Sequence, residues 1–221
     1  MIIGICGAKG SGKSTTANIL KELVPGAVDI AFADPMKEFC KKVFDFSKEQ
    51  LWGPSEEREK PDERYPRSRP HLWVKAPYSL KTCARCRAIY CAQHSETCDD
   101  FLTPREALQQ LGTEWGRACY PEVWVEYGIR RAKALLRPDL ERWGGVSLVI
   151  VTDVRFQNEA DAIRAAGGKV LRVTRPGCGT SDSHASEAEA ATMDVDLEIP
   201  NDGTLDDLKK ALALALEEHG L

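Results

Sequence analysis

A glycine-rich pattern at the beginning of the chain has the residues needed to hold phosphate. Residues 7–14 read GAKGSGKS, which matches G-x-x-x-x-G-K-[ST], and they lie between an apolar run and a segment with helical spacing. Glycines let backbone amides curl around phosphate oxygens, Lys13 supplies a point charge, and the Ser14 hydroxyl is placed to ligate Mg²⁺. The helix that follows directs its positive end at the same anion. A chance glycine-rich turn would lack this strand-loop-helix context, so the pattern predicts a nucleotide-binding P-loop. The residues expected to contact the nucleotide are Gly10, Ser11, Gly12, Lys13, Ser14 and Thr15.

Charged residues follow two other strand-like runs. The run 147–152 is of the kind buried in parallel sheets, and Asp153 and Arg155 come directly after it. Ligands of open α/β sheets bind at this carboxyl edge. Phosphoryl transfer needs positive charge around the moving group and an acid to help hold Mg²⁺, roles that suit Arg155 and Asp153. A surface ion pair is the alternative. Asp34 and Lys37 form a further candidate pair after the second run, although Asp34 is also suited to cap a helix.

The elements that must position these residues alternate along the chain. Strand-like runs lie at 2–5, 28–33, 147–152, 170–173 and 197–199. Helical segments separate them, including one introduced by a capping box at 103–106 and a closing helix capped by Thr204. The alternation predicts the α/β class, with a P-loop NTPase fold: a doubly wound, parallel five-stranded sheet with helices on both faces. We expect a single domain over residues 1–221.

The stretch 53–100 departs from this alternation. It holds a charge run and several prolines, shows little periodicity, and is therefore interpreted as an insertion in the domain. It also contains a cluster of soft metal ligands with the spacing C-x2-C-x4-C-x2-H-x3-C. A tetrahedral Zn²⁺ site needs four such ligands, and free thiols are the alternative. The preferred set is Cys83, Cys86, Cys91 and Cys98, with His94 as a substitute. An all-cysteine site would be structural, because it leaves no open position for water.

Composition restricts the remaining possibilities. The 221 residues carry a net charge of −4 with a pI near 5.7, so no overall basic field favours nucleic acid. The first residues do not resemble a signal peptide, and the longest apolar run is far too short to span a membrane. We therefore expect a cytoplasmic protein without a membrane partner, whose eight cysteines are free thiols or metal ligands rather than disulfides.

Several stretches together resemble the deoxynucleoside monophosphate kinases of bacteriophages, a branch of the P-loop NMP kinases. The resemblance covers residues 1–52 and about 101–221, and its motifs are short but jointly specific in order and spacing. The matching stretches are FADPMK at 32–37, REALQQLGTEWGR at 105–117, TDVRFQNE at 152–159, RPG at 175–177, DSHASE at 182–187 and NDGT at 201–204.

This resemblance implies transfer of the ATP γ-phosphoryl group to a (deoxy)nucleoside 5′-monophosphate, in the host cytoplasm if a phage encodes the chain. The P-loop would hold ATP, and Arg155 resembles the arginine that contacts the transferred phosphates. Arg175 would belong to a short lid, and Asn201 and Gly203 would lie beside the adenine. The segment after the second strand and the helix over 103–117 would form the monophosphate side.

On that helix, Arg105 and Gln109 are four residues apart and share a face, which Thr113 shares only in part. Arg105 would hold the acceptor's 5′-phosphate while Gln109 reads a base edge, unless the face is merely solvated. Two other functions stay open: a different small-molecule P-loop kinase, similar to dephospho-coenzyme A kinase, or an ATP-responsive nucleic-acid-binding module that uses the basic, aromatic insertion. A homodimer is also left open.

Overall fold

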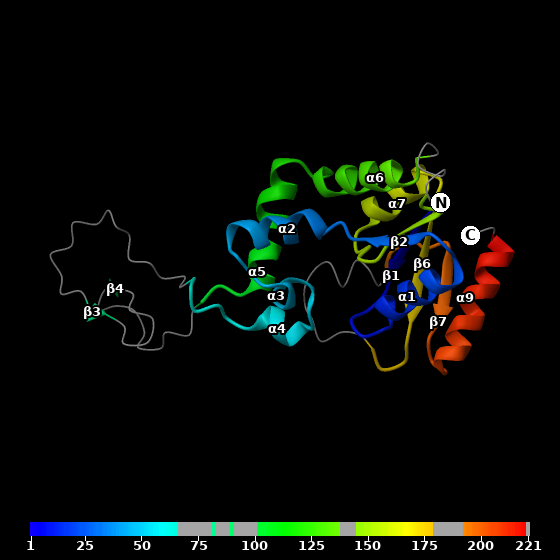
Figure 1. Ribbon diagram of the computed structural model, residues 1–221, viewed down its shortest axis with the longest axis horizontal. Coiled ribbons are helices and arrows are strands. Elements are labelled where there is room, and N and C mark those ends of the chain that lie inside the picture. The colour runs from blue at the N-terminus through cyan, green and yellow to red at the C-terminus, as the bar shows by residue number, and fades with distance from the viewer. Residues whose placement is uncertain (66–80, 83–88, 91–100, 138–144, 179–191, 220–221) are drawn as a thin grey trace. The chain divides into compact units, whose positions relative to one another are not determined.

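The computed structural model describes residues 1–65, 81–82, 89–90, 101–137, 145–178 and 192–219. The chain divides into two compact units, which are described separately (Figure 1). The sheet unit comprises Met1–Asp34 and Tyr120–Leu221, and the helical unit comprises Pro35–Cys119. No helix in the described part of the chain is long and apolar enough to cross a membrane.

The sheet unit is built on five parallel strands in the order β2-β5-β1-β6-β7. The strands are β1 (Ile2–Cys6), β2 (Ala27–Ile30), β5 (Leu148–Val151), β6 (Lys169–Thr174) and β7 (Leu197–Pro200). Every residue of the central strands β1 and β5 is buried, as expected for strands covered on both faces. The predicted α/β class and five-stranded parallel sheet are confirmed.

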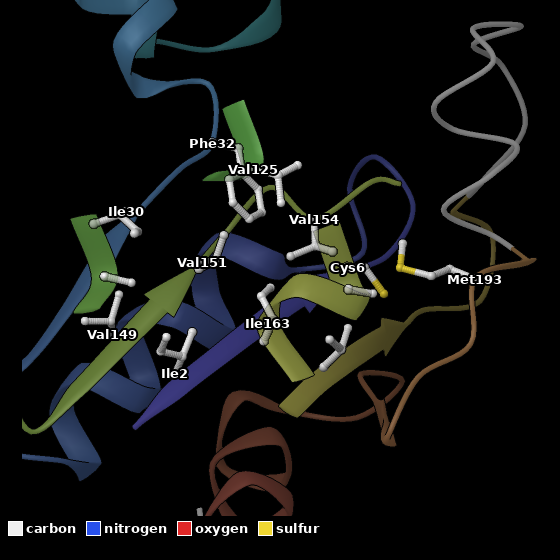
Figure 2. Packing of buried hydrophobic residues seen from close by; sticks show 13 residues of the cluster. Ile2, Cys6, Ile30, Phe32, Val125, Val149, Val151, Val154, Ile163 and Met193 are labelled. Carbon is white, nitrogen blue, oxygen red and sulfur yellow. The ribbon is translucent and has the colours of Figure 1, made fainter. Parts of the chain in front are cut away.

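Helices cover both faces of this sheet, because side chains along each strand alternate between two cores. Ile3 and Ile5 of β1 pack with α1 (Lys13–Leu23) and α9 (Leu205–His219), whereas Ile2 belongs to the core under α6 (Val123–Leu135) and α7 (Gln157–Ala165). Figure 2 shows this second core, where Ile163 of α7 lies against the strands. A Cβ at Gly4 would lie 2.7 Å from Ile163 Cδ1, so the glycine permits the close approach of α7 to β1.

The second strand is shorter than its apolar run predicts, because side chains take its last backbone groups out of the sheet. β2 ends at Ile30, although the run continues to position 33. The Ala31 N–H donates to the Asp34 carboxylate (2.9 Å). The amides of Phe32 and Ala33 donate to Asp153 (2.8 and 3.0 Å). These bonds turn the chain toward α2 at the carboxyl edge of the sheet.

The helical unit contains short helices around a small core. Its elements are α2 (Asp34–Val43), α3 (Lys48–Trp52), α4 (Ser55–Glu59), the two-stranded ladder β3 (Lys81–Thr82) and β4 (Ile89–Tyr90), α5 (Pro104–Gln109) and the π-helix η1 (Gln110–Arg117). Buried Cys40, Phe46, Leu51 and Ala107 form the core, and burial raises the pKa of the Cys40 thiol to about 11. α4 lies in the stretch for which prolines and charges argued against regular structure; its five residues are too few for periodicity to reveal.

The helix predicted over 103–117 changes type at its middle. Its capping box is confirmed, since the Glu106 N–H donates to the Thr103 hydroxyl and the Thr103 N–H donates to the Glu106 carboxylate. After Gln109 the backbone continues as a π-helix, whose i→i+5 hydrogen bonds widen each turn. Gly112 is buried there, and a Cβ would lie 2.9 Å from Met36 Sδ.

Backbone hydrogen bonds join the segment that ends at Tyr65 to the segment that begins at Phe101. Asp62 N–H donates to the Leu102 carbonyl (3.0 Å), and Leu102 N–H donates to the Tyr65 carbonyl (2.9 Å). The Arg64 guanidinium and the Gln50 amide bond the buried Asp62 carboxylate, and chiefly the Arg64 bond lowers its pKa to about 2. These backbone bonds hold Asp62 and Tyr65 beside Leu102. The cysteines predicted to bind zinc (Cys83, Cys86, Cys91, Cys98) and His94 lie outside the described residues.

Candidate functional site

The phosphate loop adopts a conformation that only glycine readily permits. It runs from β1 to α1, and Gly7, Gly10 and Gly12 have φ angles of 141°, 83° and 105°. Side chains disfavour this region of φ, and a Cβ at Gly7 would also lie 2.4 Å from the Val173 carbonyl oxygen. The three glycines curl the backbone at the start of α1, as a phosphate cradle requires.

Lys13 holds the backbone of the phosphate loop, whereas the side chain of Ser14 faces solvent. Lys13 Nζ donates to the carbonyls of Gly7 (2.7 Å) and Ala8 (2.8 Å), so the ammonium is held close to the loop. Ser14 is exposed on the first turn of α1, and Thr15 is half-buried. Among the described groups, the buried hydroxyl of Ser11 finds no hydrogen-bond partner. A buried hydroxyl without a partner is costly, so its position fits a loop that receives acceptor oxygens from a ligand.

Asp153 lies at the neighbouring strand end. β5 pairs with β1, and the chain leaves β1 through α1 on one face and β5 through α7 on the other. This reversal is the topological switch point at which open α/β sheets bind ligands. Asp153 Oδ1 accepts the Phe32 N–H and Oδ2 accepts the Ala33 N–H. The carboxylate therefore joins the end of β5 to the loop after β2.

Arg155 is exposed, and a buried glutamate fixes its backbone. Glu159 is 3% exposed, and its Oε2 accepts the N–H groups of Arg155 (2.7 Å) and Phe156 (3.1 Å). This carboxylate satisfies amides at the start of α7, where the helix dipole also favours a negative charge. It thereby sets the direction in which the chain presents Arg155.

Asp34 is not a simple helix cap. It is the first residue of α2, and its Oδ2 accepts both the Ala31 N–H and Arg131 Nη1 (2.9 Å each). Arg131 lies on α6, which approaches this loop closely: a Cβ at Gly128 would lie 2.4 Å from the Phe32 ring. The ion pair joins the loop after β2 to α6.

The last two strand ends contribute the remaining predicted residues of the sheet unit. Asn201 follows β7, and its side-chain amide donates to the Ser11 carbonyl of the phosphate loop (2.7 Å). Gly203 is in the turn that enters α9, where Thr204 and Asp207 cap the helix reciprocally. Arg175 is exposed just after β6. Most of the predicted lid, including His184, lies outside the described residues.

The helical unit carries the other predicted residues. Lys37 Nζ lies 5.7 Å from the centre of the Trp52 ring, and Arg105 Nη1 bonds Glu59 Oε1 (2.8 Å). Arg105 and Gln109 share a face of α5, where residues four apart differ by about 40°. In η1 a turn contains more residues than in an α-helix. Residues four apart are therefore rotated by slightly less than a full turn, whereas in an α-helix they are rotated by slightly more. Exposed Thr113 consequently lies nearer to the Arg105 face than an α-helix would place it.

Sequence reasoning missed two residues of this site. Arg131 carries no local signal, because its partner Asp34 is 97 residues away. Glu159 did have a local signal, because an acid at the third position of a helix that follows a strand end is the second half of a capping box. In the described part of the chain, no group of three or more His, Cys, Asp and Glu residues could hold a metal ion.

Comparisons with known proteins agree with the resemblance drawn from the sequence motifs. A family model described as deoxynucleotide monophosphate kinase matches residues 87–212. A putative deoxynucleotide monophosphate kinase of Acanthamoeba polyphaga mimivirus is 31% identical over 212 residues, which are 94% of this chain and 91% of the relative. The deoxynucleotide monophosphate kinase of Enterobacteria phage T4 is 45% identical over 112 residues, 50% of this chain and 44% of the phage protein.

Solved structures add little to this. Shikimate kinase from Aquifex aeolicus covers 100% of this chain and aligns over 99% of its own length, but with 14% identity and a TM-score of 0.45. That likeness is too weak to carry an argument.

The family model spans more than half of the chain, and the viral relative aligns over nearly its whole length. The chain therefore belongs to the deoxynucleotide monophosphate kinase family.

Proposed function

We propose that the chain transfers the γ-phosphoryl group of ATP to the 5′-phosphate of a deoxynucleoside monophosphate, giving ADP and the deoxynucleoside diphosphate. The observation that carries this proposal is the pairing of a phosphate loop with Asp153 and Arg155 at neighbouring strand ends, in a chain of this family. In this reaction an acceptor phosphate oxygen attacks the γ-phosphorus in line. The bond from that phosphorus to the β,γ-bridging oxygen breaks, and ADP leaves with the electron pair.

Such a transfer needs positioning and positive charge rather than a covalent nucleophile. The loop amides from Gly10 to Thr15 bind the ATP phosphates, and Lys13 adds its charge to the outer ones. Because two loop carbonyls hold the Lys13 ammonium, little side-chain freedom is lost when phosphate binds. Arg155 supplies the charge for the transferred group, and Glu159 holds its backbone in place.

Mg²⁺ fits the oxygen donors at this edge. Magnesium prefers hydroxyl, carboxylate and phosphate oxygens, and it neutralises phosphate charge when it is bound. Exposed Ser14 would supply the hydroxyl, and the glycine cradle leaves room for the phosphates beside it. Asp153 would help to hold the ion. Its two oxygens each accept one backbone N–H from the loop after β2, which holds the carboxylate at the end of β5.

The acceptor nucleotide would be bound by charged and polar residues at the start of α2 and along α5 and η1. Arg105 holds the 5′-phosphate, and its bond to Glu59 keeps the guanidinium oriented. Gln109 and Thr113 follow along the same face and read the base. Asp34 and Lys37 complete this set, with Arg175 of the lid reaching the phosphates. Asn201 and Gly203 belong to the ATP side.

The proposal is tested by ADP release from ATP with each deoxynucleoside monophosphate in turn, and with dephospho-coenzyme A as a rival acceptor. We expect turnover with at least one deoxynucleoside monophosphate. Lys13→Ala should abolish turnover while the circular dichroism spectrum is unchanged. Lys21→Ala is the matched control, because Lys21 lies on the same helix but pairs with Asp29 at the surface. No stimulation by any deoxynucleotide, or full activity of Lys13→Ala, would contradict the proposal.

We also propose a structural Zn²⁺ on Cys83, Cys86, Cys91 and Cys98, on the basis of their spacing alone. The purified chain should contain about one zinc per molecule by elemental analysis. The double variant Cys83→Ser/Cys86→Ser should lose that zinc. A chain that stays zinc-free after refolding with zinc would contradict the site.

A further inference from the structure

Asn201 connects three neighbouring strand ends of the sheet unit. Its backbone N–H donates to the Thr174 carbonyl at the end of β6 (2.7 Å). Its side-chain Nδ2 donates to the Ser11 carbonyl in the phosphate loop, also at 2.7 Å. Because β6 lies between β1 and β7, the asparagine reaches across one strand end to contact the loop that follows β1. Both bonds are short enough to be well formed.

The bond to Ser11 determines the direction of a phosphate-binding group. The Ser11 carbonyl and the Gly12 N–H belong to one planar peptide, and the described residues contain no cis peptide bond. In a trans peptide these two groups point in opposite directions. Holding the carbonyl toward Asn201 therefore holds the Gly12 N–H away from Asn201. That N–H is one of the backbone donors with which a P-loop cradles phosphate.

The glycine at position 12 makes room for this contact. Gly12 has a φ of 105°, and a Cβ there would lie 2.3 Å from Asn201 Nδ2. Real Cβ atoms essentially never come so close to another heavy atom. The neighbouring amide cannot move away easily, since the Thr174 and Ser11 carbonyls hold both ends of its residue. Gly12 is thus required twice, for its backbone angle and for the space that Asn201 occupies.

We propose that Asn201 is a positioning residue for the phosphate loop, which fixes the Ser11–Gly12 peptide so that the Gly12 N–H faces the nucleotide phosphates. The inference rests on the proposed use of ATP by this loop. It differs from the expectation that Asn201 lies beside the adenine, because Asn201 would then act on the base and not on the phosphates.

A ligand without a base distinguishes these two roles. Binding of ATP and of inorganic triphosphate is measured by titration calorimetry on the full chain and on Asn201→Ala, Asn201→Asp and Asn18→Ala. If Asn201 acts through the loop, Asn201→Ala weakens both ligands by about tenfold, the upper range for one hydrogen bond. Asn201→Asp weakens both further, because a carboxylate repels the Ser11 carbonyl. Exposed Asn18 on α1 is the matched control and changes neither. Weaker ATP binding with unchanged triphosphate binding would overturn the inference.

Steady-state kinetics and a double substitution exclude a merely structural effect. The KM for ATP should rise about tenfold in Asn201→Ala, while the KM for the deoxynucleotide stays within about twofold. The loss of ATP affinity caused by Gly12→Ala should be smaller in the Asn201→Ala background, where the 2.3 Å conflict is relieved. Equal losses in both backgrounds would overturn the inference. A chain that binds triphosphate yet phosphorylates no deoxynucleotide would refute the proposed function alone.

Discussion

Two carboxylates at the switch point, half-buried Asp153 and buried Glu159, should lose stability to different extents when each is replaced by its amide. Asp153 uses both of its oxygens, one for the Phe32 N–H and one for the Ala33 N–H. Glu159 accepts the N–H groups of Arg155 and Phe156 with the same oxygen, Oε2. Replacing a carboxylate by its amide turns one oxygen into an NH₂ donor. Asp153→Asn must therefore lose one of its two bonds, whereas Glu159→Gln can keep both.

The size of each effect follows from these contacts. In Asp153→Asn, one backbone N–H of the Phe32–Ala33 loop faces a donor instead of an acceptor, which costs about 2 kcal/mol. That amount corresponds to about a 30-fold rise in local opening. In Glu159→Gln, both N–H groups still find an oxygen. The substitution also removes the negative charge at the N-terminus of α7, which is worth about 0.3–1 kcal/mol.

Hydrogen exchange measures these openings where they occur. Amide exchange by mass spectrometry should accelerate about 30-fold in peptides that contain positions 32 and 33 of Asp153→Asn, and by less than about fivefold around 155–156 in Glu159→Gln. Urea unfolding should show the same order of stability. The exposed substitution Glu217→Gln on α9 serves as the neutral control. If Asp153→Asn exchanges like the unchanged chain, the carboxylate does not hold the loop and the reasoning fails.

Two further predictions concern stability. Asp62 has its pKa lowered from 3.8 to about 2, chiefly by Arg64, so it stabilises the fold above pH 4 and this contribution is lost as the pH falls toward 2. Because the Arg64 side chain is half exposed, we expect Asp62→Asn to cost only about 1 kcal/mol at pH 7 in urea unfolding, and less at pH 3; a constant difference would contradict the pair. Gly128→Ala should lower the melting temperature, since its Cβ would lie 2.4 Å from the Phe32 ring and overpacking costs about 1–3 kcal/mol. An increase, as expected for alanine at an open helical position, would show that α6 does not pack so closely.

Local signals predicted most of the sheet unit. The five apolar runs gave the strands, because residues buried on both faces need continuous hydrophobicity. The capping box at Thr103 and the helix cap at Thr204 were visible, since the residues that they bond lie three positions away. The P-loop was visible because its glycines meet a steric requirement of the backbone. Each of these signals is contained in a few consecutive residues.

The π-helix and the early end of β2 left no comparable signal. Residues 110–117 read QLGTEWGR, a sequence that does not distinguish i→i+4 from i→i+5 hydrogen bonds, and its two glycines, Gly112 and Gly116, are buried. The second apolar run continues past Ile30, but carboxylates at positions 34 and 153 remove its amides from the sheet. Pattern reasoning proposed both carboxylates as candidate site residues but did not predict the backbone groups that they bind.

That failure has a physical reason, which also predicts where substitutions matter. Asp153 and Asn201 each use a side chain on one loop to bond the backbone of another. Every residue except proline carries the same amide, and every residue carries the same carbonyl, so the partner positions show no sequence preference through these bonds. Changes at 153 or 201 should therefore disturb the switch point strongly. A change at Ala33 should leave the bond to Asp153 intact unless the new residue is proline, which has no N–H to donate.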